Sequence, residues 1–419
     1  MIIRNSIIFI FFELINKSIP FLLLPILTRF LTPDDYGIIA SFTALVSFLA
    51  IFIGLSGHGA IDANFFRLEK NKLGIYIANV LIILLLTTFL SLVSVLLFSD
   101  FIESKLYISL EWQILGIIVA LGQFITLINL SLWVIEQRPL QFGIYQFLQT
   151  ILITVISIIL IIGYSYNWQG QIIGIIIGTL LFSFFSLIIL FKRGYMNLKI
   201  DKLYIKDFLK FGIPMVPHQL SAWLRTQGDK FIIISILGSA TTGLFSVGQQ
   251  MGLVMSILMS SLNKALYPIL FQILSNEMTK NSKNKLVKIS YLLFLLIAFI
   301  GFILMILLQL LYPYFLGKEF QNSLFLTQLI VLGFILEGFY YVVVNYIFYF
   351  KKTASLAKIT FFVSIIHIIM SFLFVKLFGI NGVGYALIIS GIIQFILIWY
   401  LSNKIYSMPW FSFWRKDEI

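Results

Sequence analysis

The sequence predicts an all-α integral membrane protein with twelve transmembrane helices, arranged as two six-helix bundles around a central cavity. Of its 419 residues, 60% are hydrophobic and only 11% are charged. The apolar residues form repeated runs of about 20, the length at which a helix crosses a bilayer. Lys and Arg gather in alternate connections between these runs. A soluble core cannot bury so much apolar surface, and a membrane β-barrel would show short alternating strands instead.

The apolar runs define twelve expected spans. They lie at residues 6–30, 36–58, 74–98, 112–134, 142–164, 170–191, 211–236, 243–272, 289–311, 324–349, 356–378 and 383–401. Turn-forming residues mark the joins, for example at residues 32–35 and 238–243. The first run has no small-residue cleavage site, and Glu13 and Lys17 interrupt it. We therefore expect a retained helix and not a signal peptide.

The basic residues predict the orientation of the chain. With the N-terminus, the alternate connections and the C-terminus on one side, that side holds 21 Lys and Arg residues and the opposite side holds 4. This bias follows the positive-inside rule and predicts that both termini are cytoplasmic. Membrane topology also explains the net charge of +12, so we expect no nucleic-acid partner.

The longest connection divides the chain into parallel halves. We expect an N-terminal bundle at residues 1–191, a cytoplasmic linker at 192–210, a C-terminal bundle at 211–401 and a cytoplasmic interfacial tail at 402–419. Residues 31–37 and 237–243 form a weak echo 206 positions apart, each after the first helix of its half. Two halves around a central cavity are typical of alternating access.

Charged residues inside the apolar runs are the candidate functional residues. A charge near the middle of a membrane helix costs about 2.5 kcal/mol or more, so it usually faces water or a partner. Glu13 and Lys17 share a helix face at i, i+4 and can form an ion pair. Arg225 and Asp229 repeat this spacing in the span at 211–236, and Lys230 follows. A guanidinium can hold phosphate oxygens with two hydrogen bonds.

Three more charges complete the candidate set. Arg29 ends the first span, Lys264 lies in the span at 243–272, and Glu337 lies in the middle of the span at 324–349. We predict that Lys17, Arg29, Arg225, Lys230 and Lys264 bind an anionic cargo. Glu13, Asp229 and Glu337 are candidates for ion coupling or charge pairing. For each charge the alternative is a structural ion pair or an interfacial anchor.

Other chemistry lacks a sequence signal. The chain has no cysteine, no His, Asp or Glu cluster at metal-ligand spacing, no P-loop and no nucleophile motif. We therefore expect no catalytic residue, no metal and no cofactor.

Two sets of residues resemble a known family. Residues 25–37, with Pro25, Arg29 and the pair Tyr36-Gly37, are similar to a signature at the first two helices of polysaccharide-export proteins. Residues 211–214 (Phe-Gly-Ile-Pro), 229–232 (Asp-Lys-Phe-Ile) and 243–245 (Gly-Leu-Phe) resemble the matching segment at helices seven and eight. Together with twelve spans, the chain resembles the Wzx-type O-antigen flippases of the multidrug/oligosaccharidyl-lipid/polysaccharide exporter superfamily.

The resemblance implies a specific activity. Such proteins move undecaprenyl-pyrophosphate-linked oligosaccharide repeat units across the bacterial inner membrane, and an ion gradient is their expected driver. Membrane lipids, a polysaccharide polymerase and a chain-length regulator are the implied partners. Arg29 and Asp229 fall within the family signatures. One departure is that Asp62 and Ala63 stand after Gly57, where the family often has a basic residue.

Two alternatives stay open. A cation-coupled multidrug antiporter of the same superfamily should have an acidic cavity, whereas the deep charges here sum to only +1. A membrane-embedded polysaccharide polymerase should have a large outer loop that carries chemistry, and the expected outer loops are short.

Overall fold

The computed structural model describes residues 2–275 and 279–411, and over these residues it is helical and contains no strand. The chain divides into two compact units, Met1–Gly243 (unit 1) and Leu244–Ile419 (unit 2). The all-α membrane fold predicted from the sequence is confirmed. Division into bundles at residues 191 and 211 stays a prediction.

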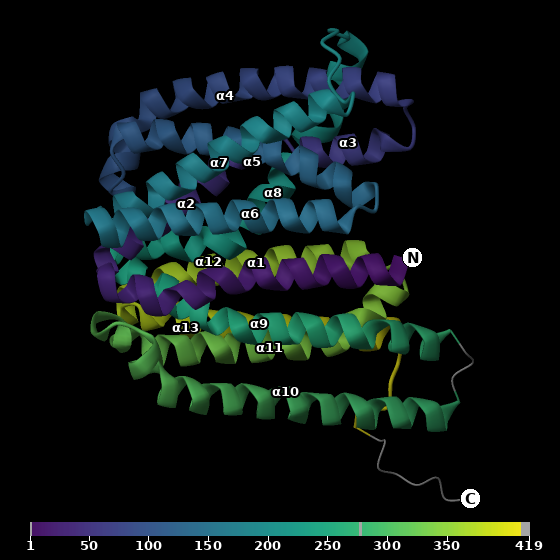
Figure 1. The fold of residues 1–419 in the computed structure, drawn as a ribbon. Coiled ribbons are helices and arrows are strands. Elements are labelled where there is room, and N and C mark those ends of the chain that lie inside the picture. The colour runs from purple at the N-terminus through teal and green to yellow at the C-terminus, as the bar shows by residue number, and fades with distance from the viewer. Residues whose placement is uncertain (1, 276–278, 412–419) are drawn as a thin grey trace, which may run out of the picture. The chain divides into compact units, whose positions relative to one another are not determined.

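Unit 1 contains eight α-helices and one π-helical turn (Figure 1). They are α1 (Ile2–Phe30), α2 (Pro33–Gly54), α3 (Gly57–Phe65), α4 (Lys70–Leu106), α5 (Leu110–Ile135), α6 (Pro139–Ile158), the π-helical turn η1 (Ile159–Gly163), α7 (Asn167–Lys192) and α8 (Lys202–Leu237). The helix α9 (Ser239–Leu274) begins in unit 1 and continues into unit 2.

Unit 2 contains the rest of α9 and four further α-helices. They are α10 (Lys280–Phe315), α11 (Leu324–Tyr349), α12 (Thr353–Phe378) and α13 (Asn381–Ile405), with a short 3₁₀-helix, η2 (Lys318–Ser323), before α11. The predicted span at 324–349 has the same bounds as α11.

The core of unit 1 lies around α2, α4 and α5. Phe42, Ile77 and Ile128, one from each of these helices, are fully buried. Small residues allow close approach of neighbouring helices, as in many membrane proteins. On α5, a Cβ at Gly122 would lie 3.1 Å from the side chain of Thr179 on α7. The helix α6 packs against α7 and α1, so α1 sits at the edge of the unit-1 core.

In unit 2 the central helix is α11, which packs against α13 and α10. A Cβ at Gly384 on α13 would lie 2.6 Å from the Cβ of Leu329 on α11. Further along the two helices, Val343, Ile347 and Ile398 are fully buried and form part of the unit-2 core. As in unit 1, glycine at the contact brings two helices close together.

Eleven helices of the described residues are long and apolar enough to cross a membrane. The predicted twelfth span, 211–236, corresponds to α8, which is 36 residues long but more polar than the others. Its polarity arises from the charges that mark it as a candidate site, Arg225, Asp229 and Lys230. The count of twelve spans and the cytoplasmic position of both termini stay predictions.

The predicted span at 36–58 is wrong at its end, because the helix breaks there. Leu55 and Ser56 both have left-handed backbones, with φ of 44° and 54°, between α2 and α3. A left-handed backbone conformation costs about 1 kcal/mol or more at a residue other than glycine. The break falls in a glycine-rich stretch, Gly54-Leu-Ser-Gly-His-Gly59, which the predicted span ran through.

Two further segments differ from their expected form. The second half of the linker predicted at 192–210 is helical, because α8 begins at Lys202 with Asp201 as its N-cap. In the predicted interfacial tail, Trp410 is buried, with its ring against Trp399 and Tyr291. The tail therefore packs on unit 2 at this position, and its place at the membrane interface stays a prediction. Trp414 and its basic neighbours lie outside the described residues.

Candidate functional site

In unit 1, Glu13 and Lys17 form an ion pair on α1. The Lys17 Nζ lies 2.6 Å from Glu13 Oε1, and the two side chains are 58% and 48% exposed, in that order. They line a pocket of about 540 Å³ between α1, α5 and α6, together with Phe9, Ile10, Asn16, Val134, Phe142 and Gln146. Two opposite charges in the middle of the first span therefore line a cavity.

The same pocket has polar groups on its α6 side. Asn16 donates a hydrogen bond to Gln146 Oε1 at 3.2 Å. The Asn16 Oδ1 atom is buried and has no hydrogen-bond partner. Amide groups beside an ion pair can bind a phosphate or a hydroxyl-rich ligand, because they both donate and accept hydrogen bonds.

Arg29 lies in the last turn of α1 and is exposed. The turn that follows is rigid, because Thr32 and Asp35 form a capping box at the start of α2. Asp35 also accepts a hydrogen bond from the backbone of Trp168 on α7 at 3.3 Å. The signature of residues 25–37 therefore builds a fixed corner, with Arg29 at its exposed edge.

The three candidate charges of α8 differ in exposure. Arg225 is exposed, Asp229 is buried and Lys230 is partly buried. Nearby, Trp223 donates to Ser47 Oγ on α2 at 3.0 Å, and its ring packs 5.1 Å from that of Phe48. The indole of Trp223 thus holds α8 against α2 close to the exposed Arg225.

In unit 2 the candidate residues lie on α11 and α9. Glu337 on α11 is partly buried, accepts a hydrogen bond from Ser256 Oγ at 3.2 Å and another from the hydroxyl of Tyr341 at 3.0 Å. Lys264 on α9 is exposed. The roles of all eight candidate residues stay predictions.

Sequence reasoning missed a charged cluster where α5 and α7 end. Glu136 pairs with Arg193 and, at 3.1 Å, with Arg138, and it accepts a hydrogen bond from the Tyr195 hydroxyl at 2.6 Å. The Arg193 guanidinium also lies over the ring of Trp133, 5.8 Å from its centroid. Burial, and next the hydrogen bond to Glu136, raise the pKa of Tyr195 to about 12.

The sequence indicates only the local part of this cluster. Glu136 lies two residues after the predicted span at 112–134 and two residues before Arg138. Arg193 lies 57 residues further on, so its approach depends on the packing of α5 against α7. Asp62, the departure from the family pattern, accepts a hydrogen bond from Ser131 on α5.

Within the described residues, no group of three His, Cys, Asp or Glu side chains could hold a metal ion. The described residues instead include exposed cations, the Glu13 carboxylate paired with a lysine, and the Glu337 carboxylate, which accepts hydrogen bonds from two hydroxyl groups. Such groups can bind an anion and exchange a proton or a small cation.

These features define a multi-pass α-helical membrane protein with charged side chains on its membrane helices. Residues 2–274 match the polysaccharide biosynthesis protein family, and the chain belongs to that family. Protein 1 of the Lsg locus of Haemophilus influenzae is 25% identical over 414 residues, which cover 96% of this chain and 98% of that protein.

Two solved structures share the fold. The inward closed conformation of the lipid II flippase MurJ superposes with a TM-score of 0.68 at 16% identity, covering 96% of this chain and 87% of MurJ. The inward-facing conformation of a multidrug resistance MATE family transporter of the MOP superfamily gives a TM-score of 0.67 at 16% identity, covering 93% of this chain and 95% of the transporter. The chain therefore has the fold of this superfamily.

Proposed function

We propose that the protein is a flippase that moves lipid-linked oligosaccharide repeat units, such as those of O-antigen, across the bacterial inner membrane. The carrier is undecaprenyl pyrophosphate, and alternating access coupled to an ion moves the cargo. Membership of the polysaccharide biosynthesis protein family supports this proposal, as does the likeness to a structure named as a lipid II flippase. A polymerase and a chain-length regulator are the partners that such a pathway would require.

The observation that carries the proposal is the Glu13–Lys17 pair in its pocket on α1. Lys17 can pair with Glu13 or with a phosphate oxygen of the cargo. When the phosphate binds, Lys17 turns from Glu13 to the phosphate, and the new negative charge repels the Glu13 carboxylate. In an apolar span this carboxylate then binds a proton or a small cation, and it gives up that ion when the cargo leaves. Exchange of partners at Lys17 would therefore link binding of the cargo to binding of the ion.

The exposed Arg225 supplies a second cation, suited to bidentate contact with phosphate. Arg29, Lys230 and Lys264 are assigned to the same anionic cargo, while Asp229 and Glu337 are assigned to ion coupling or charge pairing. Glu337 is suited to this role because the hydroxyls of Ser256 and Tyr341 hold its carboxylate in place.

A deletion strain complemented with variants tests the proposal. Lys17→Ala and Arg225→Ala should abolish surface polysaccharide on a silver-stained gel, while immunoblots show normal protein in the membrane. Lys105→Ala, which removes an exposed cation at the end of α4, is the matched control and should leave the polysaccharide unchanged. Normal polysaccharide in both the Lys17 and the Arg225 variant would contradict the site, and normal polysaccharide in the deletion strain would contradict the function.

The likeness to a multidrug resistance transporter favours a second candidate function, export of small organic molecules by cation antiport. Drug susceptibility of the deletion strain separates the two functions. A flippase deletion should lose surface polysaccharide with unchanged drug resistance, whereas an antiporter deletion should become sensitive to drugs and keep its polysaccharide.

A further inference from the structure

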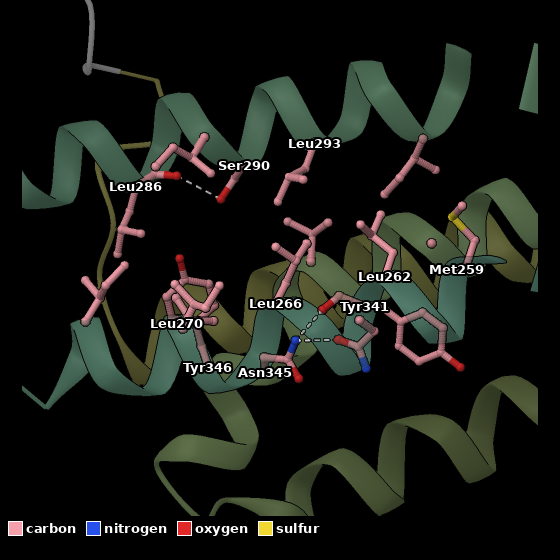
Figure 2. A pocket seen from close by; sticks show the side chains of 17 residues that line it. Met259, Leu262, Leu266, Leu270, Leu286, Ser290, Leu293, Tyr341, Asn345 and Tyr346 are labelled. Atoms are coloured by element: carbon pink, nitrogen blue, oxygen red, sulfur yellow. Dashed lines mark hydrogen bonds between the residues drawn. The ribbon is translucent and has the colours of Figure 1, made fainter. Parts of the chain in front are cut away.

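Large apolar side chains outside the candidate site occur in two different settings. In unit 2, leucines of α9 and α10 face one another across a pocket of about 110 Å³, and Asn345 on its wall donates a hydrogen bond to Asn263 at 2.7 Å (Figure 2). In unit 1, by contrast, Leu198, Ile200 and Leu203 lie on the surface and are 81%, 70% and 76% exposed. A group of exposed apolar side chains outside the membrane spans marks a contact surface.

These three side chains belong to residues 195–207, which we name the linker strap. The strap lies against the first turns of α4, where it is the teal segment in Figure 1. Asn79 on α4 donates a hydrogen bond to the carbonyl of Lys199 at 2.8 Å and accepts one from the backbone N–H of Asp201 at 3.0 Å. The strap also donates to the carbonyl of Gly74 at 3.3 Å. Its backbone is therefore held on α4 while its apolar side chains stay exposed.

The strap lies on the side of α4 that faces lipid. Asn79 is followed at intervals of seven, four and seven residues by Leu86, Leu90 and Leu97, so all four lie on one face of the helix. The three leucines are exposed, and α4 is apolar enough to cross a membrane. Asn79 is only 1% exposed, because the strap covers it. The strap therefore sits at one end of the lipid-facing stripe of α4.

The depth of the strap corresponds to the lipid headgroups. The sequence of α4 has no charged residue from Leu73 to Ser99. The 20 residues before Asp100 rise about 30 Å, which is the thickness of the hydrocarbon region. These residues begin at Val80, next to the asparagine that holds the strap. Apolar side chains at this level can enter the boundary between headgroups and acyl chains.

The exposed charges of the strap are positive. Lys199, Lys202 and Lys206 are exposed and alternate with the apolar side chains. Its two acidic side chains are used inside the protein, because Asp201 caps α8 and Asp207 accepts a hydrogen bond from a tyrosine hydroxyl of α4 at 3.0 Å. The surface thus combines ammonium groups with aliphatic groups. This combination is complementary to an anionic phospholipid, which has a phosphate above and acyl chains below.

We propose that the linker strap binds anionic phospholipids of the surrounding bilayer. The three lysines contact the phosphates, and Leu198, Ile200 and Leu203 enter the upper part of the acyl region. The strap joins α7 to α8, so this contact fixes the start of α8, the helix that carries Arg225, at the membrane surface. The lipid-facing leucines directly beside the strap favour lipid over an acidic protein partner. The inference does not depend on the identity of the cargo.

Fluorescence quenching by brominated lipids tests the proposal on the full chain. Because the chain has no cysteine, Leu198→Cys takes a single environment-sensitive fluorophore. Nanodiscs of phosphatidylcholine contain the same minor fraction of either brominated phosphatidylglycerol or brominated phosphatidylcholine. Brominated phosphatidylglycerol should quench residue 198 roughly threefold more strongly. A fluorophore at Leu86→Cys, on the lipid-facing stripe, is the control, and the two lipids should quench it equally.

Two results at residue 198 would overturn the proposal. Equal quenching by the two brominated lipids would mean contact with bulk lipid and no preference for anionic headgroups. Quenching by neither lipid, with normal quenching at residue 86, would mean that the strap faces water or a protein partner.

Charge variants test whether the lysines carry the preference. One variant replaces the three strap lysines: Lys199→Gln, Lys202→Gln and Lys206→Gln. The matched control removes the same charge from exposed lysines at the start of α10: Lys280→Gln, Lys285→Gln and Lys288→Gln. The strap variant should quench equally with both lipids at residue 198, whereas the control should keep the threefold preference. Normal quenching at residue 86 verifies that each variant is inserted. A preference that persists in the strap variant would contradict headgroup binding by these lysines.

Discussion

Gly37 on α2 lies directly against the backbone carbonyl of Ser239, the first residue of α9. A Cβ at Gly37 would be 1.9 Å from that oxygen, and the hydroxyl of Ser239 donates a hydrogen bond to Asp34. Gly243 makes the reciprocal contact, because a Cβ there would be 1.8 Å from the carbonyl oxygen of Pro33. The two segments that echo each other in sequence, 31–37 and 237–243, therefore pack together within unit 1.

This contact makes Gly37 intolerant of a side chain. We predict that Gly37→Ala lowers the melting temperature of the purified protein, since backbone cannot move aside and overpacking costs about 1–3 kcal/mol. Intrinsic fluorescence during heating in detergent measures the effect. Gly163→Ala is the control, because a Cβ at Gly163 would meet nothing within 4 Å. An unchanged melting temperature for Gly37→Ala would show that the two segments are not in contact.

The positions of the helices could be predicted well from the sequence, since each span must satisfy its backbone hydrogen bonds internally and remain apolar outside. The break at Leu55 and Ser56 was missed because the span was placed by hydropathy, whereas its signal is the run of glycines at residues 54–59. Likewise, α8 is a long helix whose charges lower its hydropathy, so the criterion that finds the other spans does not find it.

The candidate site was predictable where its partners are close in sequence. Spacing of i, i+4 predicted the Glu13–Lys17 pair, which the structure contains. By contrast, Glu136 and Arg193 meet through the packing of helices far apart in the sequence, and Asn263 and Asn345 do so in unit 2. Which of the deep charges face a common cavity stays a prediction.

The cluster around Glu136 should stabilise unit 1. Glu136→Gln leaves Arg193 and Arg138 without a negative partner, in a place where the side chain of Arg193 is only 18% exposed. We expect a loss on the order of 2 kcal/mol, less than for a fully buried pair. Thermal unfolding in detergent checks this, with Glu103→Gln at the exposed end of α4 as the control. Equal melting temperatures of the two variants would contradict a stabilising role.

The same cluster predicts a dependence on alkaline pH. The pKa of Tyr195 is raised to about 12, chiefly by burial and next by the hydrogen bond to Glu136. A raised pKa in the folded state favours the neutral phenol, so its contribution to stability is complete below pH 10 and is lost as the pH rises toward 12. Tyr195→Phe has no such proton to lose.

The difference in melting temperature between the wild type and Tyr195→Phe should therefore shrink between pH 9 and pH 11.5. Other tyrosines and lysines titrate in both proteins, so their effects cancel in this difference. A difference that stays constant over this range would contradict the assigned shift.

The reversed pair, Glu13→Lys with Lys17→Glu, separates a structural role of this pair from a role in binding. Both charges remain on one face of α1 at the same spacing, so the ion pair can form again and the protein should fold. The cation, however, moves one helical turn, about 5.4 Å, away from its position in the pocket. If Lys17 binds the phosphate of the cargo, the double variant should reach the membrane in normal amounts but restore less than a tenth of the surface polysaccharide. The single variant Glu13→Lys should also be inactive. Full recovery of polysaccharide in the double variant would mean that the pair only holds α1 in place, and the cargo's phosphate would then have to be bound by the cations of α8.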